Sequence, residues 1–270
     1  TTYTYDLYGN VSTETKPNGC IYSYEYDVLN RVTKVYVQDS GKSAKVLQKS
    51  YTYDILSDKT TQTTETVTLN DTETAKTVYH YDYAERPIKQ TNPDGGNQSI
   101  KYNANGTVTS SIDAMGKTTY YKYDGLNRLT EQWIPFGDNK YTYKKIDYDK
   151  NGNKTAEKTG IEAVSLWSTP TTLTTTSYTY GENNLLKEVT DAEHNVTEYD
   201  YDENGNAVKE TVHLQDKSTK VTEYEYNHLG KVTAMTQHVA AGDMYGYAPN
   251  NTADISLLTS YTYDANGNVL

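Results

Sequence analysis

The sequence predicts an all-β protein built as a long, curved array of antiparallel β-hairpins. Three observations predict this fold class. A tyrosine-rich motif recurs along the chain, a turn signal follows each copy, and the composition is too polar for an ordinary globular core. The motif reads Tyr-x-Tyr-Asp-x-x-Gly/Asn-Asn/Arg-Val, and residues 24–32 are a clear copy. A fixed period of about 20–50 residues is typical of repeat architectures.

The second tyrosine of each copy, here called the anchor tyrosine, gives the register of the repeats. Positions below are counted from this anchor. The shortest spacing between anchors is 21 residues, and insertions lengthen six of the ten intervals. We therefore expect residues 1–270 to form a single continuous array of about eleven repeats, cut at both ends from a longer protein. The anchors are Tyr5, Tyr26, Tyr53, Tyr81, Tyr102, Tyr123, Tyr148, Tyr180, Tyr201, Tyr226 and Tyr263.

The residues that follow each anchor specify a tight turn. Position +1 is Asp or Asn in ten copies, and position +4 is Gly or Asn in nine. This pattern is typical of a type I turn followed by a left-handed residue, which closes a common hairpin loop. Gly and Asn enter the left-handed region at low cost. The same alignment puts Asp54 and Ser57 of the third copy in such a turn. The clearest expected turn pairs are Asp6 with Gly9, Asp27 with Asn30, Asp124 with Asn127, Asp202 with Gly205, and Asp264 with Gly267.

The turn also predicts which residues face each other across the hairpin. If Asp27 faces Arg31, then Tyr26 faces Val32. An aromatic residue opposite a β-branched one contributes about 0.2–1 kcal/mol. Tyr24 and Tyr26 are two residues apart and share a sheet face, so stacked repeats place ladders of tyrosine on one face. A second turn in each repeat returns the chain, which makes the array a meander of two strands and two turns per repeat.

These repeats resemble the YD repeat, also called the Rhs repeat, over essentially the whole chain. Proteins with such repeats include bacterial polymorphic toxins, insecticidal toxin complexes, wall-associated bacterial proteins and the teneurins. The resemblance implies a β-ribbon that spirals into a hollow shell, of which this chain would be a fragment. In the toxins the shell encloses a C-terminal toxic domain, which a self-cleaving region with Asp-Pro motifs releases. Asp-Pro does not occur in this sequence, so neither that region nor a toxin is expected here.

The composition excludes several classes of function. Hydrophobic residues make up 35% of the chain and the mean hydropathy is -0.85, which suits a sheet with one tyrosine-covered face and one wet face. The net charge of -11 disfavours nucleic acid and anionic membrane surfaces, since both need clustered Lys and Arg. No apolar run is long enough for membrane insertion. Cys20 is the single cysteine, so a disulfide within the chain is impossible.

The sequence offers few residues for chemistry. Asp-x-Asn-Gly-Asn stretches, as at residues 202–206, superficially resemble calcium loops but lack a complete ligand set, and turn formation explains them. The histidines are scattered, and we expect no catalytic residue, cofactor or metal. Insertions at residues 132–143, 156–177 and 237–260 lengthen the hairpins. Long loops on a rigid scaffold often bind ligands, so Trp133 and Trp167 are candidate ligand contacts that could stack on sugars, or could close local packing gaps.

Two functions remain open from the sequence. The first is a non-catalytic scaffold, a wall segment of a shell that encapsulates a cargo or toxin domain. Its partners would be other repeats of the parent chain and an enclosed C-terminal toxin domain. The second is a bacterial surface adhesion or carbohydrate-binding module that acts through its inserted loops on a glycan or cell-surface ligand. The resemblance places either function outside the cell or on the bacterial surface.

Overall fold

The computed structural model describes residues 1–137, 139–239, 255–264 and 266–270, apart from the side chain of Val239. Every regular element in these ranges is a β-strand, which confirms the all-β fold class. The central part of the 237–260 insertion, residues 240–254, lies outside the described residues. None of the described segments is a helix long and apolar enough to cross a membrane. The chain divides into two compact units, residues 1–121 and 122–270.

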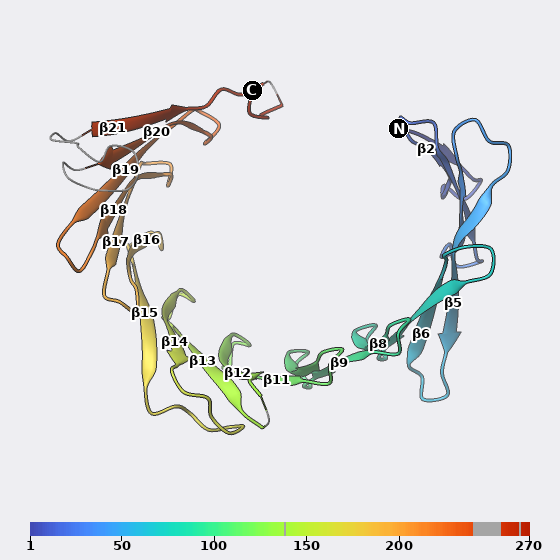
Figure 1. Cartoon of the computed structure of the whole chain (residues 1–270), viewed down its shortest axis with the longest axis horizontal. Coiled ribbons are helices and arrows are strands. Elements are labelled where there is room, and N and C mark those ends of the chain that lie inside the picture. Colours follow the sequence, from blue (N-terminus) through green and yellow to red (C-terminus); the bar gives the residue numbers. More distant parts are fainter. Residues whose placement is uncertain (138, 240–254, 265) are drawn as a thin grey trace. The chain divides into compact units, whose positions relative to one another are not determined.

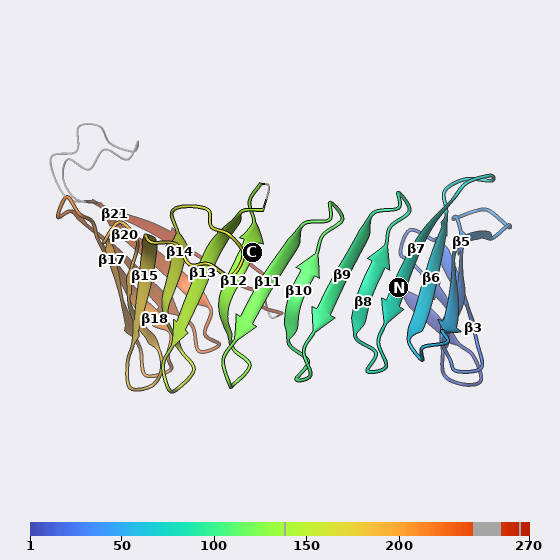
Figure 2. The same ribbon diagram turned by 90° about the horizontal axis from the view of Figure 1, so that it is seen from below.

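In the first unit each strand pairs with the next along the chain, always antiparallel. Figure 2 shows β5 to β10 side by side in this order. The sequence therefore folds as the expected meander. The strands are β1 (Thr2–Tyr5), β2 (Val11–Thr15), β3 (Ile21–Tyr26), β4 (Val32–Gln38), β5 (Val46–Ile55), β6 (Thr61–Thr68), β7 (Thr74–Tyr81), β8 (Pro87–Thr91), β9 (Asn97–Tyr102), β10 (Val108–Ile112) and β11 (Thr118–Tyr123).

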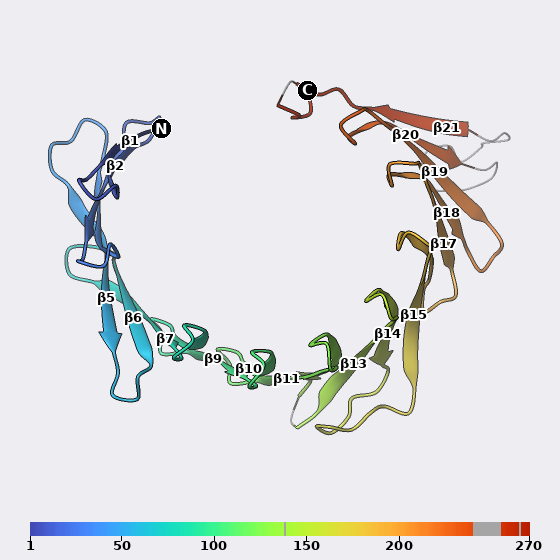
Figure 3. The ribbon, with the colours of Figure 1, turned by 180° about the vertical axis from the view of Figure 1, so that it is seen from behind.

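The second unit follows the same rule, with sequential antiparallel pairing from β12 to β21. Its strands can be followed in chain order in Figures 1 and 3. The strands are β12 (Leu129–Pro135), β13 (Tyr141–Tyr148), β14 (Lys154–Gly160), β15 (Leu173–Tyr180), β16 (Leu186–Thr190), β17 (Val196–Tyr201), β18 (Ala207–His213), β19 (Thr219–Tyr226), β20 (Val232–Val239) and β21 (Ile255–Ser260).

A β-bulge recurs at one position of the repeat. Tyr26 pairs with Val32 as expected, but Glu25 pairs with Lys34, so Thr33 is left without a partner residue in the ladder. A bulge bends its strand and increases the local twist. In the described pairings the bulge stands at position +7 of eight copies, whereas the third copy has none there. The skipped residues are Ser12, Thr33, Ile88, Thr109, Thr155, Lys187, Val208 and Thr233.

The turns next to the anchors share one geometry. The Asp27 N–H donates to the Arg31 carbonyl at 2.9 Å, and the Asn30 N–H donates to the Asp27 carbonyl at 3.0 Å. Asn30 is left-handed, with φ of 60°. The corresponding glycines, Gly9, Gly205 and Gly267, have φ between 81° and 84°, and Asn127 has φ of 61°. Position +4 therefore holds the residue types that tolerate this conformation.

The third copy departs from this pattern, and its turn assignment from sequence is wrong. Asp54 pairs with Gln62 inside the β5–β6 ladder, and Ile55 pairs with Thr61. The turn instead runs from Leu56 to Thr60, with Lys59 rather than Ser57 in the left-handed region. The ladder continues past Tyr53 because the long strand β6 supplies partners and no bulge interrupts it. Asp58 then supports the later turn by accepting hydrogen bonds from Thr60.

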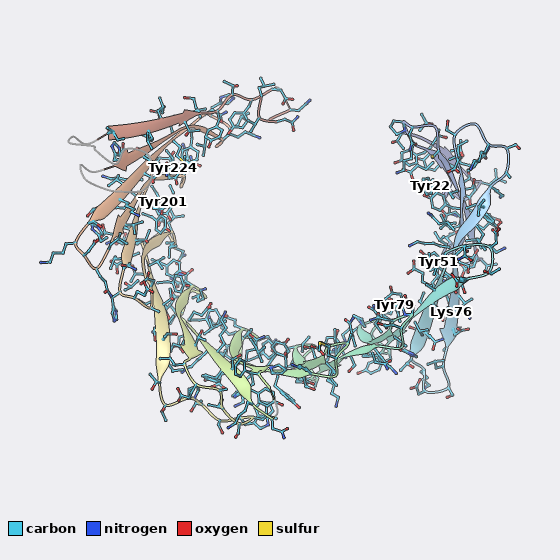
Figure 4. The ribbon with its side chains drawn as sticks, in the orientation of Figure 1. Tyr22, Tyr51, Lys76, Tyr79, Tyr201 and Tyr224 are labelled. Carbon is cyan, nitrogen blue, oxygen red and sulfur yellow. The ribbon has the colours of Figure 1, made fainter. Side chains whose placement is uncertain are left out.

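The sheet has little buried core. Among the described residues, Val35, Trp133, Tyr143 and Pro170 are the buried apolar or aromatic side chains. Tyr22, Tyr51 and Tyr79 lie on the concave side of the first unit, and Tyr201 and Tyr224 lie on that of the second (Figure 4). A single-layered sheet cannot bury both faces, so stability must come from contacts along the sheet rather than between layers.

Replacement of Gly205 by valine tests the turn geometry. Gly205 has φ of +83°, and forcing a β-branched residue into this region costs about 1–3 kcal/mol. We expect Gly205→Val to lower the free energy of unfolding by that amount in urea denaturation followed by circular dichroism. Gly125→Val is the matched control, because Gly125 is not left-handed and has open space beside its Cα. Equal losses in the two variants would contradict the turn assignment.

Candidate functional site

The anchor tyrosines connect successive repeats through their hydroxyl groups. The Tyr26 hydroxyl donates to the Val11 carbonyl at 2.8 Å, and the Tyr201 hydroxyl donates to the Leu186 carbonyl at 2.7 Å. The acceptor is always residue +6 of the preceding repeat, which faces that repeat's own anchor beside the bulge. Eight described anchors make this bond, at 2.6 to 3.0 Å: Tyr26, Tyr53, Tyr102, Tyr148, Tyr180, Tyr201, Tyr226 and Tyr263, with Val11, Val32, Pro87, Leu129, Lys154, Leu186, Ala207 and Val232 as acceptors.

The other three anchors occupy the same position in their hairpins. Tyr5 is 62% exposed and pairs with Val11. Tyr81 pairs with Pro87, and Tyr123 ends strand β11. Nine of the eleven anchors thus end a strand next to a turn, whereas Tyr53 is followed by two more residues of β5 and Tyr263 forms an isolated bridge with Val269.

Burial favours the protonated form of several anchor hydroxyl groups. Desolvation raises the pKa of Tyr26, Tyr53, Tyr201 and Tyr226 above the ordinary value of 10.0. A protonated phenol can donate a hydrogen bond, whereas a phenolate cannot. The connection between repeats is therefore intact across the neutral and mildly alkaline range.

Position +5 provides a second connection between repeats. The Arg31 guanidinium lies 4.2 Å from the ring centroid of Tyr53, the next anchor. The same guanidinium holds Asp27 of its own turn, with Nη2 at 2.6 Å from Oδ2. Arg86 and Arg128 repeat this arrangement over the next anchors, at 4.5 Å and 4.6 Å. Each arginine thus joins its own turn to the next tyrosine through a cation–π contact.

Where position +5 is asparagine, its side chain completes its own turn. Asp202 accepts hydrogen bonds from the backbone N–H groups of Asn204 and Asn206, and from Asn206 Nδ2 at 2.8 Å. These bonds stabilise the carboxylate and lower the pKa of Asp202 below its ordinary value of 3.8, with the Asn206 side chain as the largest cause. Asp6, Asp149 and Asp264 are held in the same way by Asn10, Asn153 and Asn268.

The turn carboxylates face their own backbone rather than a shared centre. In the described part of the chain, no group of three or more His, Cys, Asp or Glu side chains could hold a metal ion. The Asp-x-Asn-Gly-Asn stretches therefore build turns, with their carboxylate oxygens engaged by the residues that follow. Cys20 is a free, half-buried thiol.

The two tryptophans form one cluster with Tyr143, but only one of them reaches solvent. Trp133 is fully buried, and its Nε1 donates to the Ser168 carbonyl at 2.9 Å. Its expected role as a ligand contact is wrong, because the 156–177 insertion and Tyr143 pack against its ring. Trp167 is 51% exposed and left-handed, with φ of 66°. It packs edge-on against Trp133, with ring centroids 5.0 Å apart.

The sequence indicated a bulge in the hairpin loop, but it did not indicate the bulge at position +7, the bond between the tyrosine hydroxyl and the carbonyl, or the cation–π contact of the +5 residue with the next anchor ring. The alternation of Asn with Arg or Lys at position +5 was the one available signal. Lys231 is an example of a long side chain at this position. Its Nζ donates a hydrogen bond to the Gly267 carbonyl of the next turn at 2.6 Å. Asparagine at this position contacts the following repeat in two copies, since Asn10 Nδ2 donates to Asn30 Oδ1 and Asn153 Nδ2 donates to Asn184 Oδ1, each at 3.0 Å.

Removal of one hydroxyl tests the connection between repeats. Tyr201→Phe deletes the donor to the Leu186 carbonyl and leaves that part-buried acceptor without the hydroxyl, which costs about 1–2 kcal/mol. We expect a loss of that size in the free energy of unfolding. The control is Tyr8→Phe, because Tyr8 is 84% exposed and lies outside the ladder. A loss no greater than that of the control would show that the hydroxyl bond contributes nothing.

Acid should weaken the turns. The folded state lowers the pKa of Asp6, Asp149 and Asp202 below 3.8, so their stabilisation is complete above that value and is lost as pH falls through the folded pKa. We expect the urea midpoint to be constant from pH 7 to about 5 and to fall steeply below about 4. Asp202→Asn should be less stable at pH 7 and show a smaller fall. An unchanged acid slope would contradict this role.

This chain is similar to known proteins both in sequence and in fold. The Teneurin YD-shell family matches residues 116–270. The tRNA3(Ser)-specific nuclease WapA of Bacillus spizizenii is 26% identical over 271 residues, which cover 99% of this chain and 10% of that protein. The tRNA nuclease WapA of Bacillus subtilis is 26% identical over 270 residues, 98% of this chain and 9% of that protein. The chain thus spans about a tenth of the length of these relatives.

Two solved structures share the fold. The crystal structure of TcdB2-TccC3-Cdc42 matches with a TM-score of 0.67 and 15% identity, over 99% of this chain and 15% of that one. The crystal structure of TcdB2-TccC3-TEV matches with a TM-score of 0.66 and 16% identity, over 99% of this chain and 14% of that one. At these identities the likeness concerns the fold alone.

Proposed function

Since the chain belongs to the Teneurin YD-shell family, we propose that it is a non-catalytic wall segment of a shell that encapsulates a cargo or toxin domain. The array is continuous over residues 1–270 in this proposal. The observation that carries it is the series of hydroxyl-to-carbonyl bonds from one repeat to the next. Such bonds make the sheet extendable by any number of repeats, which a wall requires.

We do not assign to this chain the nuclease activity that the names of its relatives state. The chain spans about a tenth of each WapA protein, so we assign the nuclease activity to another part of those proteins. Within this chain the turn carboxylates are engaged by their own turns, and the net charge of -11 repels the phosphates of RNA. The anchor tyrosines and the turn residues act as framework.

The proposed partners are the other repeats of the parent chain and an enclosed domain, which in a toxin would be C-terminal. The proposed location is outside the cell or on a bacterial surface. This location rests on the family alone, since the single cysteine is compatible with the cytosol as well as with a bacterial surface.

Limited proteolysis of the parent protein tests encapsulation. With the native array, we expect the enclosed domain to be cleaved much more slowly than the same domain expressed alone. Gly205→Val, which weakens the wall, should speed cleavage of that domain, whereas Gly125→Val should not. Cleavage at the free domain's rate in the native protein would overturn the encapsulation proposal.

A separate assay tests the non-catalytic assignment. The 270-residue chain, incubated with total tRNA, is expected to leave every tRNA uncut. Specific cleavage that persists after repurification would overturn the scaffold assignment, whatever the proteolysis experiment shows.

Glycan binding by the second unit is the alternative function, favoured by the exposed edge of Trp167. Its ring is backed by the buried Trp133, and the Lys122 Nζ lies 5.3 Å from the ring centroid. An aromatic face beside a charged donor suits a sugar ring. On a glycan array, Trp167→Ala should abolish any specific signal. A signal that survives Trp167→Ala would exclude this site.

A further inference from the structure

The first motif tyrosine, at position -2, forms a ladder of its own. In two repeats its hydroxyl reaches the side chain at position +9 of the preceding repeat. The Tyr24 hydroxyl lies 3.2 Å from Glu14 Oε2, and the Tyr121 hydroxyl lies 3.0 Å from Ser111 Oγ. The fifth repeat carries Ile100 at position -2, and position +9 of the preceding repeat is Gln90. The ladder therefore lacks a phenol ring at Ile100, while a polar side chain that could bind its hydroxyl is present.

A pocket of about 280 Å³ occupies this place in the first unit, and its lining includes Ile100, Gln90 and Tyr79. Tyr79 pairs with Gln90 across β7 and β8, Gln90 pairs with Gln98, and Ile100 pairs with Ser111. Directly paired residues share a sheet face, so these five lining residues lie on one face. That face carries Tyr79, which lies on the concave side of the unit (Figure 4).

The lining of the pocket matches a phenol in size and chemistry. An apolar cavity of about 150 Å³ is large enough to hold benzene, so a ring fits within the larger volume found here. The Tyr79 ring and the Ile100 side chain supply apolar walls. Gln90 Nε2 donates to Asn92 Oδ1 at 2.7 Å, which leaves Gln90 Oε1 as the acceptor for an incoming hydroxyl.

We propose that the pocket beside Ile100 binds a para-substituted phenol ring, whose hydroxyl donates to Gln90 Oε1. The occupant is the side chain of a tyrosine in a polypeptide held against this face. The choice of occupant rests on the proposed scaffold function, in which a polypeptide is enclosed. The choice of a phenol ring is independent of that function, because it follows from the absence of a tyrosine at position 100 of the ladder.

Titration of the 270-residue chain with p-cresol tests the site. In methyl NMR spectra, the Ile100 methyl resonances should shift and saturate with a Kd on the order of 1 mM, as expected for a ligand of eight heavy atoms. Toluene, which lacks the hydroxyl, should bind several-fold more weakly. Absence of saturable shifts at Ile100 would overturn the site.

Substitutions separate this pocket from general adsorption. Ile100→Tyr restores the ladder, so it should abolish p-cresol binding and raise the melting midpoint by about 2–4 °C. Ile146→Tyr is the matched control, since Ile146 also stands at position -2 but faces Glu157, which Lys144 and Lys154 hold. It should leave p-cresol binding unchanged. Binding that survives Ile100→Tyr in folded protein would overturn the proposal.

Two further measurements address the hydroxyl and the occupant. Gln90→Leu leaves the ring space open, and it should reduce p-cresol binding to the level of toluene. N-acetyltyrosinamide should compete with p-cresol at Ile100, because it carries the ring on a peptide backbone. Binding of p-cresol without this competition would overturn the tyrosine occupant. None of these results depends on proteolysis of the parent protein, so failure of this site and failure of the scaffold function are distinguishable.

Discussion

The hydrogen bond from an anchor tyrosine hydroxyl to a carbonyl of the preceding repeat is the interaction on which this structure depends. A single-layered sheet has no second layer to pack against, and few side chains are buried. Backbone ladders alone would join the strands but would not hold the tyrosine-covered face in register. Tyr26, Tyr201 and their counterparts do so, because each ring covers the neighbouring repeat while its hydroxyl binds a defined backbone atom.

The bulge and the turn position the groups that form this hydrogen bond. At position +7 the ladder skips one residue, as at Thr33, and this interruption lies beside the residue whose carbonyl accepts the next tyrosine. The turn aspartate then orients position +5. When that residue is an arginine such as Arg31, it binds Asp27 and stacks on the next anchor ring. Turn, bulge and tyrosine therefore act as one unit, and the unit repeats because each copy supplies the surface that the next copy requires.

The same arrangement explains why polar residues are plentiful and reactive sites are few. Asp202 is engaged by three hydrogen bonds within its own turn, and the described carboxylates form no metal-binding group. We therefore propose roles for surfaces, chiefly the tyrosine-covered face and the aromatic cluster around Trp167. In both places the repeat departs from its usual sequence. On the tyrosine-covered face Ile100 replaces a tyrosine, and an insertion carries Trp167.

The sequence by itself determined the repeat, the all-β class, the pairing of Tyr26 with Val32, and the left-handed residue at Gly205. These follow from local rules, since a turn specifies its own residues and a strand alternates its faces. Only the tertiary structure decided where the β5–β6 turn closes, because the ladder beyond Tyr53 depends on the partners that β6 supplies. It also decided that Trp133 is buried and Trp167 is exposed, because the insertion that follows β14 folds back onto β12. Contacts between segments far apart in the chain leave no periodic signal in the residues that make them.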